Sequence, residues 1–210
     1  MISAAGESLW RGSAPLVLAS QSEARRLALQ QTGAAFVVQP ADVDERAIEA
    51  QVAAAGGGPD DIAARLAREK ALVVSALRPG ALVIGADQVA SCEGRRFGKP
   101  ADIAAAADQL RFLSGRTHRL HSALALARDG GLLLEIVAHA DLTMRVFSEA
   151  FLAHYLDVVG ARVTSSAGAY QIEGLGIHLF EQISGDHWTI LGLPLTPLLA
   201  ALRREGVLLS

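Results

Sequence analysis

The sequence contains a single cysteine, which excludes an internal disulfide and a metal site built from several thiolates. Cys92 lies in a predicted turn, and no acid–base partner is spaced around it, so we interpret it as an incidental thiol. Aromatic residues make up only 5% of the chain, too few for a platform on which the bases of single-stranded nucleic acid would stack.

Long apolar runs and blocks of like charge are also missing. No stretch approaches the ~18 apolar residues of a membrane helix, and residues 1–14 lack the apolar centre of a signal peptide. The formal net charge is −3, and no basic segment offers an electrostatic footprint for nucleic acid. We therefore expect a cytoplasmic protein with no membrane and no nucleic-acid partner.

Lysine is scarce, and its positions are therefore informative. Only two of the 19 basic residues are lysine, Lys70 and Lys99, and the others are arginine. A compact ammonium group suits some sites better than the planar arginine fork, so these lysines are candidates for such sites. Chance placement is the alternative.

What the sequence does contain is an alternation of apolar strands and amphipathic helices, which is typical of α/β proteins. At 210 residues the chain can bury a sizeable core. The expected strands are 15–20, 34–40, 82–90, 177–183 and 189–193, with a hairpin over 117–147 that turns at Asp129. The expected helices are 22–33, 59–77, 101–113, 148–160 and 194–206, and a further helix follows the acidic start of segment 41–58 and is broken by Gly56 to Gly58. The predicted fold is α/β, with one mixed sheet, flanking helices and an elongated, two-lobed form.

The segment LVIGADQVA, residues 82–90, carries a carboxylate inside an apolar strand. An unpaired buried carboxylate is costly, so we expect Asp87 to contact a cation or to share a proton with a partner. Lys70 and Lys99 are the candidate cations.

Two further segments offer groups that bind phosphate or metal. ASQSEARR joins a strand end to a helix start, and its serine hydroxyls, backbone N–H groups and arginines are the donors that an anionic phosphate needs. A capped helix with two surface arginines is the alternative. DVDE, residues 42–45, has three carboxylates that could hold Mg²⁺ or could form a solvated acidic helix start.

In chain order, the segments LVLASQSEARR, DVDE, LAREKA, VIGADQV, GKP, LSGRTH, AGAYQIEGLG and ILGLPL resemble the Maf-like nucleoside triphosphate pyrophosphatases, the septum formation protein Maf family. The resemblance extends over residues 15–206, which we expect to form a single domain, with residues 1–14 as an N-terminal extension. It implies an elongated α/β fold related to the ITP pyrophosphatases, with two lobes around a central cleft.

The resemblance also implies an activity and its residues. The expected enzyme hydrolyses modified or non-canonical nucleoside triphosphates to the monophosphate and pyrophosphate, with a divalent cation, Mg²⁺ or alternatively Mn²⁺. By motif position, Asp87 would be the base and a metal neighbour, and Glu45 would help to bind the metal. Gly85 and Ala86 would leave room for the nucleotide and the metal. Lys70 and Lys99 would steady the triphosphate. The phosphates would be cradled by Ser20, Ser22, Arg25 and Arg26.

The resemblance gives a weaker indication of the nucleobase. Gln88 and Glu173 match the subfamily described for 7-methyl-GTP, whereas the dTTP/UTP subfamily typically has Thr and Gln at these positions. The chain departs from both at Ala24, where the first type usually has Trp and the second Arg, so cation–π stacking from this position is absent. Glu23 replaces a usual Pro, and His187 an often-found Tyr.

Two other functions remain open at this level. One is a nucleotide-binding regulator of cell division without essential catalysis, since the family name refers to septum formation. The other is a nucleotidyltransferase, which phosphate-binding loops in an α/β chain would also suit. Asp87, Glu45 and both lysines favour catalysis. A homodimer is an expectation of the family resemblance alone.

Overall fold

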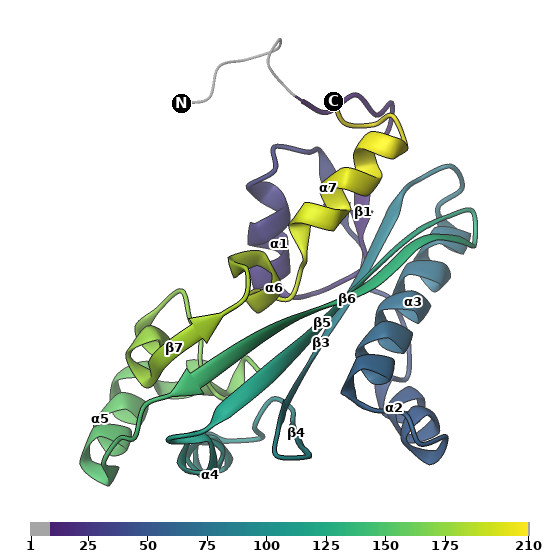
Figure 1. Cartoon of the computed structure of the whole chain (residues 1–210). Coiled ribbons are helices and arrows are strands. Elements are labelled where there is room, and N and C mark those ends of the chain that lie inside the picture. Colours follow the sequence, from purple (N-terminus) through teal and green to yellow (C-terminus); the bar gives the residue numbers. More distant parts are fainter. Residues whose placement is uncertain (1–8, 210) are drawn as a thin grey trace. The chain divides into compact units, whose positions relative to one another are not determined.

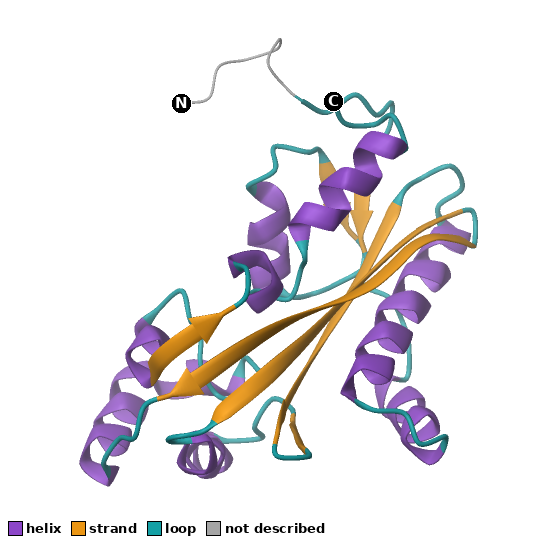
Figure 2. Ribbon diagram, viewed as in Figure 1, coloured by secondary structure: helices purple, strands orange, loops and turns teal. Residues whose placement is uncertain are grey.

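The computed structural model describes residues 9–209, so residues 1–8, most of the predicted extension, lie outside the described range. The chain divides into two compact units. Among the described residues, unit 1 contains 9–88, Ser122–Ala138 and 187–209, and unit 2 contains Val89–His121 and His139–Asp186. Figures 1 and 2 show the helices and the strands, whose order in the sheet is β2-β1-β3-β5-β6-β7, with β4 paired to β3.

Parallel strands begin the sheet in unit 1. β1 (Leu16–Leu18) lies between β2 (Phe36–Val38) and β3 (Val83–Cys92), and both pairings are parallel. α1 (Glu23–Gln30) connects β1 to β2, whereas α2 (Glu45–Ala54) and α3 (Pro59–Leu77) connect β2 to β3. Because β1 and β3 run in the same direction, the residues after β1 and those in the later part of β3 meet at one edge.

The core of unit 1 lies on both faces of β1, as the alternation of strand side chains requires. Leu16 and Leu18 belong to a cluster that includes Leu29 of α1 and Leu198 of α7 (Leu195–Arg204). On the other face, Val17 packs with Val74 of α3 and with Val83. Figure 1 shows α1 and α7 on one side of β1 and α3 on the other.

The two ends of the described chain pair with each other in unit 1. Trp10 forms a bridge with Leu208, and the Arg11 amide donates to the Val207 carbonyl at 2.8 Å. Trp10 also packs against the core cluster that contains Leu16. Residues 9–11, which the sequence assigned to an extension, therefore contribute to the packing of this unit.

Unit 2 combines strand ends with two helices. β4 (Arg95–Phe97) pairs antiparallel with β3, and β7 (Phe180–Ser184) pairs antiparallel with β6 (Gly131–Met144). α4 (Ile103–Leu113), α5 (Glu149–Val159) and the 3-10 helix η1 (Gly160–Thr164) pack together, and a second 3-10 helix, η2 (Leu175–Leu179), precedes β7. β5 (Thr117–Arg128) and β6 are the predicted hairpin, turning at Asp129 and Gly130, whose φ angles are 51° and 74°.

Two predicted strands are wrong in whole or in part. Residues 189–193 are not a strand, because α6 (His187–Ile190) is helical, with the Leu191 amide donating to the His187 carbonyl at 3.1 Å. Of the predicted strand 177–183, only the part from Phe180 is extended. Short apolar runs fit a strand and a buried helical turn equally well, so the contacts of the folded chain decide between them.

The sequence also missed β4. This strand has only three residues, two of them arginine, so it lacks the apolar alternation that predicts a strand. It forms because Glu93 and Gly94, with φ angles of 49° and 77°, turn the chain back onto β3.

The predicted fold class is confirmed, with a mixed sheet and helices on its faces. The helix predicted over 59–77 has those bounds as α3, and α5 has the predicted Ser148 cap and Gly160 stop. Within residues 9–209, none of the helices has the length and apolar character needed to cross a bilayer.

Candidate active site

The start of α1 is built by two serines and an arginine. Ser22 is the N-cap, and its hydroxyl oxygen accepts from the Arg25 amide at 3.4 Å. Ser20, which is buried, accepts from the Ser22 amide at 3.2 Å and from Arg25 Nη1 at 3.1 Å. The predicted phosphate-binding segment is therefore an ordered turn in which Ser20 and Arg25 contact each other directly.

Arg25 is held by backbone carbonyls from two other elements. Its Nη1 donates to the Ala86 carbonyl of β3 at 2.7 Å, and its Nε donates to the Gly192 carbonyl after α6 at 2.9 Å. Burial lowers the pKa of the Arg25 guanidinium, and the negative charges of Asp87 and Glu45 act in the opposite direction. Arginine stays protonated even so, and this fixed cation is suited to an anionic ligand.

Arg26 differs from Arg25 because it lies at the surface. Its guanidinium forms a two-point ion pair with Glu23, in which Nε donates to Oε2 at 2.9 Å and Nη2 contacts Oε1. The pair lowers the pKa of Glu23 and raises the pKa of Arg26 through the hydrogen bonds between them. A phosphate that bound Arg26 through Nε and Nη2 would therefore displace Glu23.

The α2–α3 hairpin brings Glu45 and Lys70 together. Between the two helices, Gly57 lies against Val52, and a Cβ there would be 2.5 Å from Val52 Cγ1. Asp44 is the N-cap of α2, and its Oδ1 accepts a hydrogen bond from the Ala47 amide at 3.0 Å. The next residue, Glu45, forms an ion pair with Lys70, with 2.7 Å between Oε1 and Nζ. The acidic segment thus supplies one carboxylate to Lys70 and one helix cap.

Asp87 is the second carboxylate on Lys70. Lys70 Nζ donates to Asp87 Oδ1 at 2.7 Å, and the two side chains are only 9% and 12% exposed, compared with 53% for Glu45. The predicted cation beside Asp87 is therefore Lys70 of α3. Because a low-dielectric environment strengthens the attraction between charges, this buried contact fixes both side chains.

The predicted role of the small residues before Asp87 is wrong. A Cβ on Gly85 would overlap the Ala67 carbonyl and lie 2.7 Å from the Ala71 amide, so Gly85 admits the backbone of α3 rather than a ligand. Ala86 is fully buried in the core of unit 1. The absence of bulk therefore serves to seat α3 against β3, which is what places Lys70 beside Asp87.

Gln88 bonds with its own chain. Its Nε2 lies 2.7 Å from Ser122 Oγ and 3.1 Å from each of the Thr189 and Ile190 carbonyls. Sequence reasoning did not single out Ser122 or Thr189, since a backbone carbonyl can come from any residue type. The only feature of the sequence that pointed to this region was the glycine-rich segment that contains Gly192.

The remaining predicted residues, Lys99 and Glu173, belong to unit 2, and both are exposed. Lys99 follows β4 in a loop that Gln109 of α4 holds by donating to the Gly98 carbonyl at 3.1 Å. Glu173 precedes η2. The structure therefore brings the other predicted residues together in unit 1: Ser20, Ser22, Arg25, Glu45, Lys70, Asp87 and Gln88, with Arg26 on the same helix as Arg25.

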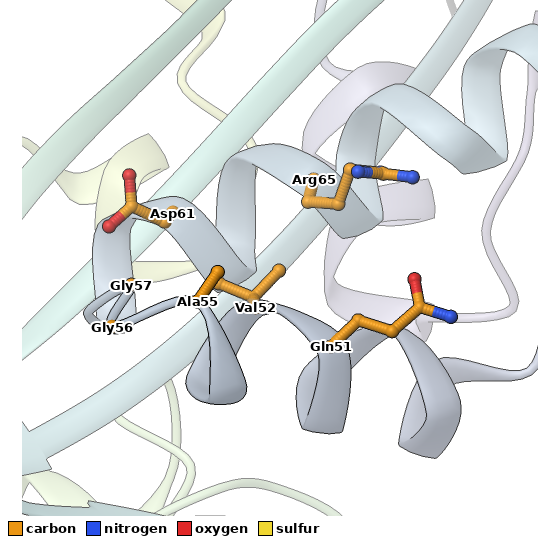
Figure 3. Close-up of a pocket in the computed structure, with 7 residues that line it drawn as sticks. All are labelled: Gln51, Val52, Ala55, Gly56, Gly57, Asp61 and Arg65. Carbon is orange, nitrogen blue, oxygen red and sulfur yellow. The ribbon is translucent and has the colours of Figure 1, made fainter.

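A hollow of about 470 Å³ lies between α2 and α3, and its lining residues are not those of the predicted site. In Figure 3, Asp61 projects from the start of α3 close to Gly56 and Gly57, whereas Arg65 projects from α3 farther along the helix. The lining consists of Gln51, Val52, Ala55, Gly56, Gly57, Asp61 and Arg65, and it includes none of the predicted site residues. The hollow is therefore separate from the charged cluster around Lys70.

Glu45 and Asp87 are two carboxylates that could hold a metal ion. Each carboxylate has an oxygen 2.7 Å from the same atom, Lys70 Nζ, so the two groups converge on one point. Carboxylate oxygens are the ligands that Mg²⁺ prefers, and such sites leave further positions for water and phosphate. The donor set therefore fits a hard divalent cation.

A family model described as Maf-like protein matches residues 15–205. The chain belongs to the Maf-like protein family. The chain is similar to a nucleoside triphosphate pyrophosphatase of Rhodopseudomonas palustris strain CGA009, with 57% identity over 95% of the chain and 98% of that protein. A protein of the same name from Bradyrhizobium diazoefficiens is 56% identical over 95% of the chain and 98% of its own length. A relative named 7-methyl-GTP pyrophosphatase, from Rhizobium etli strain CFN 42, is 54% identical over 92% of the chain and 97% of its own length.

Proposed function

We propose that this Maf-like protein is a hydrolase that converts nucleoside triphosphates to the monophosphate and pyrophosphate. The observation that carries the proposal is the cluster in unit 1, where Lys70 joins Asp87 and Glu45, with Arg25 close enough for both carboxylates to affect its pKa. The names of the relatives support the same chemistry.

The residues of the cluster have complementary tasks in this reaction. Water attacks the α phosphorus, and the bond between this atom and the oxygen that bridges the α and β phosphates breaks. Pyrophosphate leaves with that oxygen. Asp87 would take the proton of the attacking water on Oδ2, because Oδ1 faces Lys70. Arg25, the backbone N–H groups at the start of α1 and Lys70 would offset the negative charge of the phosphates.

A divalent cation, Mg²⁺ or alternatively Mn²⁺, is part of the proposal. Glu45 and Asp87 would hold it, and when bound it would polarise phosphate oxygens and lower the pKa of bound water. Lys70 would keep the two carboxylates close together when no cation is bound, and this reduces the repulsion between them.

The preferred nucleobase is a finer part of the proposal. We favour a modified purine such as 7-methyl-GTP, since the chain has Glu173 and a relative carries that name. A carboxylate can accept hydrogen bonds from the N1–H and 2-amino groups of guanine, and it attracts a cationic methylated base. The amide nitrogen of Gln88 already bonds with the chain, so Glu173 is the better candidate for contact with the base.

The test is pyrophosphate release from 7-methyl-GTP, dTTP, UTP, CTP derivatives and ITP, with and without Mg²⁺. Asp87→Asn should lower kcat by about 10²–10⁴-fold, because the amide cannot accept the proton. Asp157→Asn, at an exposed position of α5, is the matched control and should keep the wild-type rate.

Each alternative function predicts a different result in the same panel. Binding of nucleotide without any pyrophosphate release would favour the regulator of cell division. Release only in the presence of a second acceptor would favour a nucleotidyltransferase. A near-normal rate for Asp87→Asn would remove Asp87 from the role of base.

Three further expectations belong to the proposal. These are a cytoplasmic location, a homodimer and a single domain over 15–206 with two lobes around a cleft. Light scattering of the purified protein tests whether it is a homodimer.

A further inference from the structure

The side chain of Gln88 leaves β3 on the side opposite to Asp87, because successive side chains of a strand alternate. Its Nε2 lies within hydrogen-bond distance of Ser122 Oγ and of the Thr189 and Ile190 carbonyls. Ser122 Oγ itself donates to the Thr189 carbonyl at 2.7 Å, and both Ser122 and Thr189 are fully buried. The two hydrogens of the amide nitrogen are therefore engaged by three oxygen atoms of the protein.

These bonds hold the end of α6 and the residues that follow it, together the Thr189–Gly192 turn. In that turn the Gly192 amide donates to the Thr189 carbonyl at 3.0 Å, and Gly192 has a φ angle of +83°. A Cβ on Gly192 would lie 3.2 Å from Arg25 Nε and 3.6 Å from Gln88 Cβ. Gly192, Arg25 and Gln88 are thus packed against one another, and a side chain at residue 192 would separate them.

The Thr189–Gly192 turn in addition holds the side chain of Arg25. The Gly192 carbonyl accepts from Arg25 Nε at 2.9 Å, whereas Nη1 is bonded to Ser20 and to the Ala86 carbonyl. Within the described part of the chain, these bonds use Nε and Nη1, and Nη2 is the nitrogen that remains for an anion. The direction in which Nη2 points therefore depends on where Gly192 is held.

We propose that Gln88 is a positioning residue for Arg25. It fixes the Thr189–Gly192 turn, the turn fixes the guanidinium, and the guanidinium presents Nη2 to the phosphates of the substrate. This role rests on the proposed function only in taking the anion to be a triphosphate. This role differs from contact with the nucleobase. If Gln88 positions Arg25, its loss weakens the binding of every nucleoside triphosphate by the same factor, whatever the base.

The first experiment uses Gln88→Met, which keeps the length of the side chain and removes both donors. We expect KM to rise roughly tenfold for all nucleotides of the panel, with their relative kcat/KM values unchanged, as expected for loss of a hydrogen bond that orients a charged group. Inorganic tripolyphosphate, which has no base, should inhibit the variant with a Ki raised by the same factor. Gln30→Met, at an exposed position of α1, is the matched control and should leave both constants unchanged.

The second experiment does not depend on catalysis. Hydrogen exchange of the full-length protein should show faster exchange in Gln88→Met at the amides of residues 191–193, which donate to the carbonyls of His187, Thr189 and Trp188. Ser122→Ala removes the link to the Thr189 carbonyl and should change exchange and tripolyphosphate affinity in the same direction, by a smaller factor. If Gln88→Met does not fold, Ser122→Ala carries the test by itself.

The opposite results overturn the inference. A changed preference among bases together with an unchanged tripolyphosphate Ki would make Gln88 a reader of the nucleobase. Unchanged exchange in residues 191–193 would show that Gln88 does not hold the turn. If the protein released no pyrophosphate at all, the proposed function would fail, whereas exchange and direct calorimetric binding of tripolyphosphate would still decide the role of Gln88.

Discussion

At the scale of single residues, the charged cluster shows that neighbouring side chains in a motif can have different tasks. Asp44 caps α2, whereas Glu45 pairs with Lys70. Arg25 is fixed by carbonyls, whereas Arg26 pairs with Glu23 at the surface. The residue types alone predict anion and metal chemistry, but the division of tasks within each pair depends on which way each side chain points.

Glu23 gives a prediction at this scale. If Arg26 binds phosphate, Glu23 competes with the substrate for it. Glu23→Gln should then lower KM about two- to threefold and leave kcat unchanged, since an exposed ion pair is weak. The measurement is steady-state kinetics at low salt, where exposed charges are least screened.

Glu149→Gln is the control for this prediction, because it removes a comparable exposed pair with Arg111 on α4 and α5. Its KM should equal that of the wild type. An unchanged KM for Glu23→Gln would mean that Arg26 does not contact the phosphates.

At the scale of elements, the position of α3 against β3 determines the site. Sequence patterning predicted the bounds of α3 well, because its apolar positions recur at helical spacing and Pro59 marks its start. It could not predict the helix's distance from β3, which depends on the missing side chain of Gly85. For the same reason, the prediction that Gly85 leaves room for nucleotide and metal was wrong.

Gly85→Ala should therefore be severely destabilising. The added methyl group meets the backbone of Ala67 and Ala71, which cannot rotate away as a side chain can. We therefore expect a loss of about 3 kcal/mol in the free energy of unfolding. Urea denaturation measures this loss, and pyrophosphate release should fall with it because Lys70 moves away from Asp87.

Gly98→Ala provides the comparison, since a Cβ there would meet nothing within 4 Å. We expect its free energy of unfolding to be within about 0.5 kcal/mol of the wild type. Equal stability of the two variants would contradict the close packing of α3 on β3.

At the scale of the whole molecule, the stability of the chain depends on pH through a buried histidine. His118 in β5 forms a 2.7 Å hydrogen bond between Nε2 and the Tyr170 hydroxyl, and its Nδ1 has no hydrogen-bond partner in the part of the chain that the structure describes. Burial lowers the pKa of His118 from 6.5 to about 4, against a smaller opposite effect of Asp141.

The sign of the effect follows from the lowered pKa. The unfolded chain takes up a proton at His118 as the pH falls below 6.5, whereas the folded chain resists protonation until about pH 4. Stability is therefore lost as the pH falls through this window, and we expect a loss of about 2 kcal/mol between pH 7 and pH 5 from this group.

Urea denaturation at pH 7, 6 and 5 measures the loss, and His118→Gln should flatten the dependence by that amount. His154→Gln, at an exposed position of α5, should leave the dependence unchanged. An NMR titration that placed the His118 pKa near 6.5 in the folded protein would contradict the prediction.

The sequence by itself determined the fold class, most helix bounds and the chemical classes of the site residues, because hydrophobic period, capping residues and turn glycines are local properties. It also carried the family resemblance, which the family model over 15–205 confirms. Only the tertiary structure decided that Lys70 joins Asp87 to Glu45, that residues 187–190 are helical and that Gln88 bonds to the turn before Gly192. These contacts join segments far apart in the chain, and several involve backbone carbonyls, which every residue has and no pattern of side chains can mark.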